Sequence, residues 1–268
     1  MNDPRDAFRE LHEQGLFVMP NPWDVGSARL LAWLGFRALA TTSSGHAASL
    51  GRLDQHVDRD EMLAHAAAIA EAVDVPVSVD AERCFADDPE GVAETVRLIA
   101  GTGAAGCSVE DYDPATGAID PLEVAVDRVA AAAGAARPTG LVLTARAENH
   151  LYGLGDLDDT IARLRAYRDA GAEVVYAPGL LDLDEIARVV REGEAPVNVL
   201  ARPRSPSIPE LASVGVRRVS TGGALAMAAY GSLVSAAGEL LDAGTSSYLA
   251  GAVGDDVLEA AFRQRKRG

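Results

Sequence analysis

The chain has 268 residues, 48% of them hydrophobic, so it can bury a full core in one large domain or two small ones. Its formal net charge of −16 repels polyphosphate backbones and anionic membrane surfaces, so we expect neither nucleic acid nor a membrane as a partner. The only lysine is Lys266, which excludes an interior Schiff base of the aldolase or pyridoxal phosphate kind.

Cysteine usage and the chain's start point to a cytoplasmic protein. Cys84 and Cys107 form neither a paired framework nor a zinc spacing. The first residues are charged, and no apolar run reaches the about 18 residues that a membrane span needs. A reduced, cytoplasmic setting follows as the expectation.

Eight short apolar runs alternate with longer, alanine-rich stretches of helical spacing. This alternation is typical of repeated βα units and predicts a (β/α)8 barrel. We expect one barrel domain over 1–268, with 224–268 as a C-terminal helical extension. The runs that we expect as strands cover 16–20, 37–43, 75–80, 105–111, 140–146, 173–178, 196–201 and 217–223.

The predicted helices carry acids early and arginines late, as the helix dipole favours, in 58–73, 88–103 and 157–173. Beyond the eighth run, 224–244 is apolar on more than one face. Two explanations stay open for this stretch. It packs against a partner subunit, or it is the last barrel helix in a crowded groove.

Polar residues follow the predicted strands one after another, and in such a barrel the C-terminal strand ends form the active site. Several carboxylates that meet in one pocket repel each other unless a cation is present. We predict Mg²⁺, with Mn²⁺ as an alternative, bound directly by Asp80 and through water by Glu82, Glu110 and Asp54.

Arg146 is the predicted anion clamp, because a guanidinium binds a carboxylate or phosphonate in a bidentate manner. Backbone N–H groups of a turn over Ser43, Ser44 and Gly45 are expected to hold the other anionic end, and Asn198 joins the substrate-binding set. A cation and an arginine together stabilise an enolate. We therefore predict chemistry at C3 of a pyruvyl unit in a small anionic substrate, with Arg146, Asp54 and Glu110 as the catalytic residues.

Structural explanations stand beside the catalytic ones. Asp111 and Glu148 could cap the helices that follow them, and Arg146 could be a structural ion-pair partner. His46 is either an exposed loop residue or a catalytic acid. Cys84 and Cys107 fit best as small buried side chains.

Six segments in this order, TTSSGHAASLGRLD, SVDAERCF, SVEDYD, TARAEN, APVNVL and VRRVSTGG, resemble the isocitrate lyase and phosphoenolpyruvate mutase superfamily. The resemblance implies a (β/α)8 barrel whose C-terminal helix is swapped between subunits, in a dimer or a dimer of dimers (homotetramer). It also implies magnesium and 2-keto acid substrates bound as enolates. By position, Asp80 matches the direct metal ligand, Glu82 stands where an aspartate is usual, and Glu110 matches the acid that holds metal-bound water.

Asp54, Arg146 and the Ser43–Gly45 turn also match family positions, but two segments depart from the family pattern. The segment YDPATGAIDP replaces the KxCGH lid of the isocitrate and methylisocitrate lyases, and it also lacks the lid lysine and asparagine of the phosphonate enzymes. Residues 82–85, ERCF, replace the usual DGYG and would put a cation and a bulky group near the ligand.

These departures favour a lyase or decarboxylase that needs no lid acid and acts on an oxaloacetate-like acid or a substituted malate. A C–P bond hydrolase or mutase with an altered lid is the runner-up. The third alternative is a family member that binds a keto acid without turnover, favoured by Arg83 and Cys84. A one-carbon transferase resembling the ketopantoate-forming barrels is more distant, because the interior lacks lysine.

Overall fold

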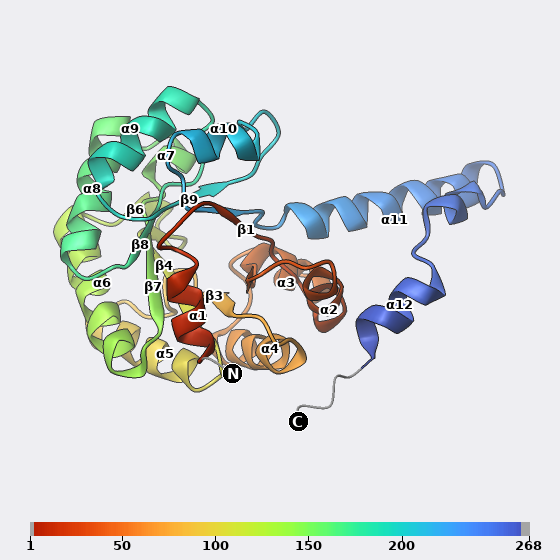
Figure 1. The fold of residues 1–268 in the computed structure, drawn as a ribbon, viewed down its shortest axis with the longest axis horizontal. Coiled ribbons are helices and arrows are strands. Elements are labelled where there is room, and N and C mark those ends of the chain that lie inside the picture. Colours follow the sequence, from red (N-terminus) through yellow and green to blue (C-terminus); the bar gives the residue numbers. More distant parts are fainter. Residues whose placement is uncertain (1–2, 264–268) are drawn as a thin grey trace.

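All eight predicted runs are strands of one parallel sheet in a computed structural model, which describes residues 3–263. The sheet curls into a nearly closed barrel with helices around it, so the predicted (β/α)8 fold is confirmed (Figure 1). Lys266 lies outside the described residues. The strands are β1 (Phe17–Met19), β2 (Leu39–Ala40), β3 (Val77–Asp80), β4 (Gly106–Glu110), β7 (Val142–Arg146), β8 (Val174–Tyr176), β9 (Val197–Leu200) and β10 (Arg218–Ser220).

The sheet runs in the order β1-β10-β9-β8-β7-β4-β3-β2, so β1 and β2 flank a seam. Two hydrogen bonds connect the strands across the seam. The Ala40 N–H donates to the Pro20 carbonyl at 3.2 Å, and the Asn21 side-chain amide donates to the Thr41 carbonyl at 2.8 Å. On the other side, the Asn21 side-chain oxygen accepts the N–H of Thr221 at 2.9 Å. Asn21 therefore joins the end of β1 to both of its neighbours.

Aspartates mark where several helices begin. Asp58 and Asp88 each accept a backbone N–H from the first turn of the following helix, which satisfies a donor that the helix itself cannot pair. The helices predicted over 58–73, 88–103 and 157–173 are α4 (Arg59–Ala72), α5 (Pro89–Ala100) and α8 (Leu157–Asp169). The others around the barrel are α1 (Pro4–Glu10), α2 (Val25–Trp33), α3 (Ser43–Ser49), α6 (Leu122–Ala136), α7 (Asn149–Tyr152), α9 (Leu183–Gly193) and α10 (Ile208–Ser213).

Helix α1 plugs the N-terminal end of the barrel. Its Phe8 is fully buried and meets His12 edge to face, with ring centroids 4.8 Å apart. A Cβ on Gly106 would lie 2.7 Å from the Phe8 ring and 2.8 Å from the Val142 carbonyl, so only glycine fits under the plug. The plug seals the barrel below the C-terminal strand ends.

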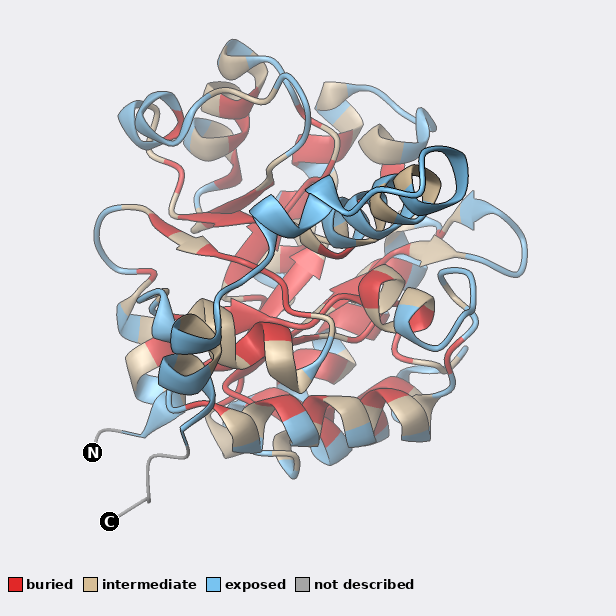
Figure 2. Cartoon of the chain, turned by 90° about the vertical axis from the view of Figure 1, so that its right-hand side faces the viewer, coloured by how far each residue is buried: buried red, intermediate tan, exposed pale blue. Residues whose placement is uncertain are grey.

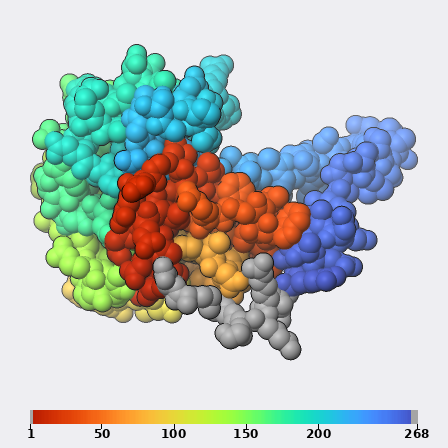
Figure 3. Space-filling view, viewed as in Figure 1, coloured from red at the N-terminus to blue at the C-terminus, as the bar shows by residue number. Residues whose placement is uncertain are grey.

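After β10 the chain leaves the barrel as a long arm, α11 (Ala224–Asp242), and returns through a 3₁₀ turn (Ser247–Gly251) to α12 (Asp255–Phe262) (Figure 1). Only Ala226 of α11 is buried, and Figures 2 and 3 show the arm exposed and projecting from the body. The alternative of a last barrel helix in a crowded groove is therefore wrong. Helix α12 packs back against α2, where the Arg29 guanidinium donates to the Phe262 carbonyl at 3.5 Å.

By length and composition alone, α11 is long and apolar enough to cross a membrane. Only 6% of its apolar stretch is buried within the described structure. One such helix is weak evidence, because core helices of water-soluble proteins meet the same criterion. Exposed apolar side chains along the arm include Leu233, Val234 and Leu241. A face of this kind is typical of a surface that another protein covers.

We expect acid to destabilise the barrel through His12, which is 6% exposed and whose pKa burial lowers from 6.5 to about 3. The unfolded chain binds the His12 proton below about pH 6.5 and the folded chain does not, so stability falls as pH drops from about 6.5 toward 3. The loss is a few kcal/mol, at about 1.4 kcal/mol per pKa unit. Chemical denaturation of His12→Gln across this range should show a shallower fall, and an unchanged slope would contradict this assignment.

Candidate active site

Arg146 ends β7 and bridges three carboxylates at the C-terminal mouth of the barrel. Its Nε lies 2.7 Å from Glu148 Oε1, its Nη1 2.9 Å from Asp80 Oδ1 and its Nη2 3.1 Å from Glu110 Oε2. The side chains of Glu148 and Glu110 are 1% and 4% exposed, so little water screens these pairs. Each guanidinium nitrogen thus faces one carboxylate.

The strand order explains why these residues meet. Asp80, Glu110 and Arg146 are the last residues of β3, β4 and β7, which are adjacent in the sheet. Glu110 and Arg146 are directly paired across β4 and β7. Because parallel strands end at the same edge, the three side chains lie side by side.

Burial and charge act against each other in this cluster. Burial raises the pKa of the Glu110 and Glu148 carboxyls, and the Arg146 charge opposes that rise. Burial also disfavours the Arg146 cation, but Glu148, Glu110 and Asp80 outweigh it and hold the Arg146 pKa well above its ordinary value. The cation therefore stays charged at every physiological pH.

Asp80 has partners on both oxygens. Besides Arg146, Oδ1 accepts from the Ser108 hydroxyl at 3.4 Å, and Oδ2 accepts the Ser43 N–H at 3.2 Å. The Asp80 N–H donates to the Thr41 hydroxyl at 2.9 Å. Residues of β4, β7 and the start of α3 thus fix the position of the Asp80 carboxylate.

Glu82 follows Asp80 in a left-handed backbone conformation, with φ of +47°. Its side chain is buried, and burial, Asp80 and Asp54 together raise its pKa to about 8. Asp54 lies on an exposed loop at the cavity's mouth, and partial burial and the charge of Asp80 raise its pKa as well. Asp54, Asp80 and Glu82 thus form a group of mutually repelling acids.

A hydrated divalent ion fits this donor set better than a directly chelated one. Within residues 3–263, no three His, Cys, Asp or Glu side chains lie close enough to hold an ion directly. Magnesium prefers oxygen ligands and keeps several waters, so one carboxylate with others acting through water suits it. The mutual repulsion of Asp80, Glu82 and Asp54 is what a cation would relieve.

A small cavity of about 170 Å³ opens beside this cluster, inside the barrel mouth. Its wall includes Asp80, Arg146 and Asp54 together with Tyr176, whose ring lies 5.2 Å from the Arg146 guanidinium carbon. Pockets for drug-sized ligands measure about 300–1,000 Å³, so this cavity suits a smaller molecule.

The predicted substrate turn is the start of a helix. Ser43, Ser44 and Gly45 form the first turn of α3, which Thr42 caps. The Ser43 N–H donates to Asp80, and the Gly45 N–H donates to the Thr42 hydroxyl at 3.3 Å. Ser43 and Ser44 line the cavity, but two of the three N–H groups already have protein partners.

Asn198 also lines the cavity, from deep inside the barrel. Its amide donates to the Ser220 hydroxyl at 2.9 Å, and its carbonyl accepts from Arg218 at 2.9 Å. The side chain is therefore fixed in the cavity floor.

Several residues take roles that the sequence analysis did not assign. Glu148 does not cap α7 but holds Arg146, and the Arg-Ala-Glu spacing is the only sequence signal for it. Gln55, which the sequence analysis did not name, donates to Glu110 through its amide at 3.3 Å. Tyr176 and Arg218, inside runs expected only to be apolar, reach the cavity.

Asp111 has a structural role, though not as a helix cap. One oxygen accepts the Glu148 N–H at 2.8 Å, and the other accepts from the Tyr167 hydroxyl and lies 3.2 Å from Arg163. His46 is neither a loop residue nor exposed: it lies on α3, stacked on His65 with centroids 3.7 Å apart. Burial lowers the pKa of His46 below its ordinary value.

The ERCF loop does not intrude on the cavity, so the expectation of a cation near the ligand is wrong. Arg83 turns away and pairs with Asp120, its Nη2 lying 2.9 Å from the carboxylate. Arg128 donates to the carbonyls of Arg83, Ala86 and Asp87, which holds the loop from behind. Like Cys107, Cys84 is buried.

The segment in the lid position is a two-stranded hairpin, β5 (Tyr112–Asp113) and β6 (Ala118–Ile119). Tyr112 stacks on Tyr152 of α7, with ring centroids 3.9 Å apart and planes 7° from parallel. Asp120 anchors the base of the hairpin through Arg83. The sequence analysis did not predict this hairpin.

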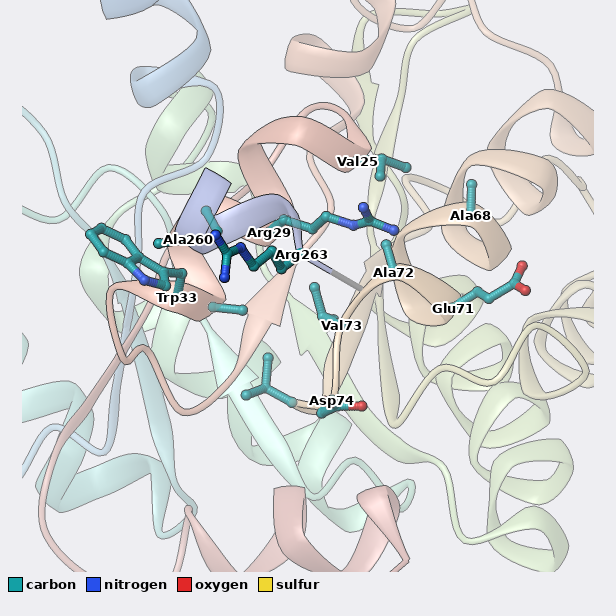
Figure 4. A pocket seen from close by; sticks show the side chains of 13 residues that line it. Val25, Arg29, Trp33, Ala68, Glu71, Ala72, Val73, Asp74, Ala260 and Arg263 are labelled. Carbon is teal, nitrogen blue, oxygen red and sulfur yellow. The ribbon is translucent and has the colours of Figure 1, made fainter. Parts of the chain in front are cut away.

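A larger hollow, about 820 Å³, lies outside the barrel between α2, α4 and α12 (Figure 4). Trp33 and Arg29 from α2 and Ala260 from α12 line it. It is distant from the strand ends that carry the charged cluster, so size alone does not identify the site.

Comparison with known proteins shows the family. The model for phosphoenolpyruvate phosphomutase matches residues 8–241. An uncharacterized protein of Mycobacterium tuberculosis, Rv1998c, is 39% identical over 219 residues, which cover 81% of each chain. The chain belongs to the isocitrate lyase and phosphoenolpyruvate mutase superfamily.

Solved structures of the superfamily agree over nearly the whole chain. A Burkholderia cenocepacia protein described as a lyase/mutase is 52% identical, with a TM-score of 0.93 over 97% of this chain and 95% of that one. Oxaloacetate acetylhydrolase in complex with oxalate is 27% identical, with a TM-score of 0.87 over 97% of this chain and 94% of that chain. The superfamily's enzymes generally depend on a divalent metal, and its lyases cleave carbon–carbon bonds, so the predicted enzyme class is confirmed.

We expect Arg146→Met to destabilise the fold, because it leaves Glu110 and Glu148 buried without their cation. Breaking a buried ion pair from one side costs about 3–5 kcal/mol. Thermal unfolding should show a Tm several degrees below that of the wild type. Arg52→Met, which removes an exposed pair with Glu61, is the matched control and should leave Tm unchanged. Equal effects of the two substitutions would refute the central role of Arg146.

Proposed function

We propose that this enzyme is a magnesium-dependent lyase or decarboxylase. Its substrate is a small 2-oxo acid resembling oxaloacetate or a substituted malate. In the oxo acid, the C3–C4 bond breaks, CO2 leaves, and the electron pair forms a pyruvyl enolate. In the malate, the 2-hydroxyl loses its proton and the C2–C3 bond breaks, which gives a 2-oxo acid and the enolate of a second carboxylic acid. One observation carries the proposal: Arg146, held by three carboxylates, borders a cavity of about 170 Å³ together with Asp80.

Arg146 is suited to bind the substrate's anionic end. Its three nitrogens each face one carboxylate, yet Nη1 and Nη2 carry two hydrogens apiece, so N–H groups remain for a substrate oxygen. Glu148, Glu110 and Asp80 fix the guanidinium before substrate arrives, which is how preorganised donors stabilise developing charge. Magnesium, held by Asp80 with Glu82, Glu110 and Asp54 acting through water, would supply a second positive charge for the enolate oxygen.

The hairpin in the lid position carries no cysteine, and we propose that water protonates the enolate. Tyr112 of the hairpin stacks on Tyr152 of α7. The names of the relatives support carbon–carbon chemistry, because they include 2-methylisocitrate lyase of Salmonella typhimurium and a 2,3-dimethylmalate lyase.

The alternatives have less support. The argument for a family member without turnover rested on Arg83 and Cys84. Arg83 pairs with Asp120, Cys84 is buried in the hydrophobic core, and neither lines the cavity. Cleavage or rearrangement of a C–P bond stays the second candidate reaction, because the matching family model is that of phosphoenolpyruvate phosphomutase. Phosphonopyruvate therefore belongs in any test.

A turnover panel tests this proposal. We expect purified protein with Mg²⁺ to release pyruvate from one of oxaloacetate, methyl-substituted malates, methylisocitrate or phosphonopyruvate, and chelator to stop the release. Asp80→Ala should lower turnover at least 100-fold and keep the far-UV circular dichroism of the wild type. Activity that survives both chelator and Asp80→Ala would rule out the metal assignment.

We also propose that α11 packs against a second copy of this chain, giving a dimer or a dimer of dimers. The exposed apolar residues Leu233, Val234 and Leu241 support this, since burying apolar area drives association. Sedimentation velocity should show an oligomer, and Leu233→Glu with Val234→Glu should shift it toward monomer. Asp242→Asn, at an exposed position of the same helix, is the control. A wild-type monomer at micromolar concentration would contradict the proposal.

A further inference from the structure

A second arginine reaches the active-site cavity from below. Arg218 lies on β10 with its side chain inside the barrel, is 2% exposed, and lines the same cavity as Arg146 and Asp80. It forms the floor together with Asn198 and Ser220. The proposed reaction does not use it.

Every hydrogen-bond partner of Arg218 is neutral. Its Nε donates to Asn198 Oδ1 at 2.9 Å, its Nη2 donates to the Thr144 hydroxyl at 3.1 Å, and its Nη1 faces His12 Nε2 at 3.3 Å. The Nδ1 of His12 lies 2.9 Å from the Phe8 carbonyl and donates to it, so Nε2 presents a lone pair to Arg218. Burial lowers the His12 pKa to about 3, which keeps this ring uncharged.

No carboxylate lies within ion-pair distance of Arg218 among residues 3–263. By contrast, the buried Arg146 has three such partners, and the buried Arg128 has Asp120 at 3.5 Å. Burial, together with the charge of Arg146 and against the opposing effect of Tyr176, lowers the pKa of Arg218 to about 9. Arg218 is therefore still a cation at neutral pH, but one without a counter-charge.

A buried cation without an anion is costly, and proteins normally pair it. The cavity beside Arg218 is the open space from which an anion can reach it. We propose that Arg218, with Asn198, is a second anion-binding site at the cavity floor, which receives the substrate carboxylate remote from Arg146 and Asp80. The enzyme thereby selects dicarboxylic over monocarboxylic acids.

This inference rests on the proposed function of the same cavity and narrows its substrate class. A volume of about 170 Å³ corresponds to roughly six water molecules, so the site suits a short-chain acid with a carboxylate at each end. Asn198 accepts the hydrogen bond from Arg218 Nε and so fixes the plane of the guanidinium group. Further N–H groups remain on Nη1 and Nη2 to bind the incoming carboxylate.

The test compares two stable 2-hydroxy acids that differ by one carboxylate, malate and lactate. Calorimetry with Mg²⁺ should show that the wild type binds malate at least tenfold more tightly than lactate. Arg218→Gln should weaken malate binding by about 10- to 100-fold, the range for losing a hydrogen-bonded charge. Lactate binding, which does not use the floor, should change less than twofold.

Asn198→Asp is the matched variant, which tests the floor site in a protein that should keep its fold. It has nearly the same shape as the wild type but puts a carboxylate beside Arg218 Nε, at the 2.9 Å contact. The internal anion should displace the ligand's carboxylate, so the preference for malate should vanish while Tm stays at or above the wild-type value.

The outcomes separate this inference from the proposed function. If malate keeps its advantage in Asn198→Asp, or if wild type binds both acids equally, the floor site is refuted while magnesium-dependent binding still supports the proposed function. If neither acid binds wild type in a magnesium-dependent way, the proposed function fails first and the floor site fails with it.

Discussion

The contact of one guanidinium with three carboxylates organises the mouth of this barrel. Asp80, Glu110 and Glu148 come from three different segments, and without Arg146 they would repel one another, with Glu110 and Glu148 buried and Asp80 half-buried. Because the charges are little exposed, their attraction is strong, and removing any partner leaves a costly charge behind. The cluster joins the ends of β3, β4 and β7 and forms part of the cavity wall.

The loop after β3 shows how the chain accommodates its departure from the family pattern. Glu82, Cys84 and Phe85 all have positive φ, at +47°, +61° and +53°, and such residues cost of order 1–3 kcal/mol each. Arg83 and Arg128 hold this loop to Asp120 and to its own carbonyls. The strain is concentrated next to the proposed metal ligands, where it fixes the buried carboxylate of Glu82.

The two arginines of the cavity differ in what surrounds them. Arg146 is neutralised by the protein, whereas Arg218 faces only neutral groups below it. A substrate with an anion at each end would meet the remaining N–H groups of Arg146 and the proposed magnesium ion at the mouth, and the unpaired cation of Arg218 at the floor. Under the proposed function, this arrangement would orient the acid with its reacting carbon near Asp80 and its remote carboxylate near Arg218.

The eight strands, the helices over 58–73, 88–103 and 157–173 and the convergence of Asp80, Glu110 and Arg146 could all be predicted from the amino-acid sequence, because hydrophobic periodicity and strand-end position are local properties. The folded structure was needed to show that α11 leaves the barrel, that 112–119 forms a hairpin, and that Arg83 turns outward. It also decided that Glu148 holds Arg146 and that Arg218 underlies the cavity. These outcomes depend on which strands become neighbours and which way each side chain points, and no local pattern contains that information.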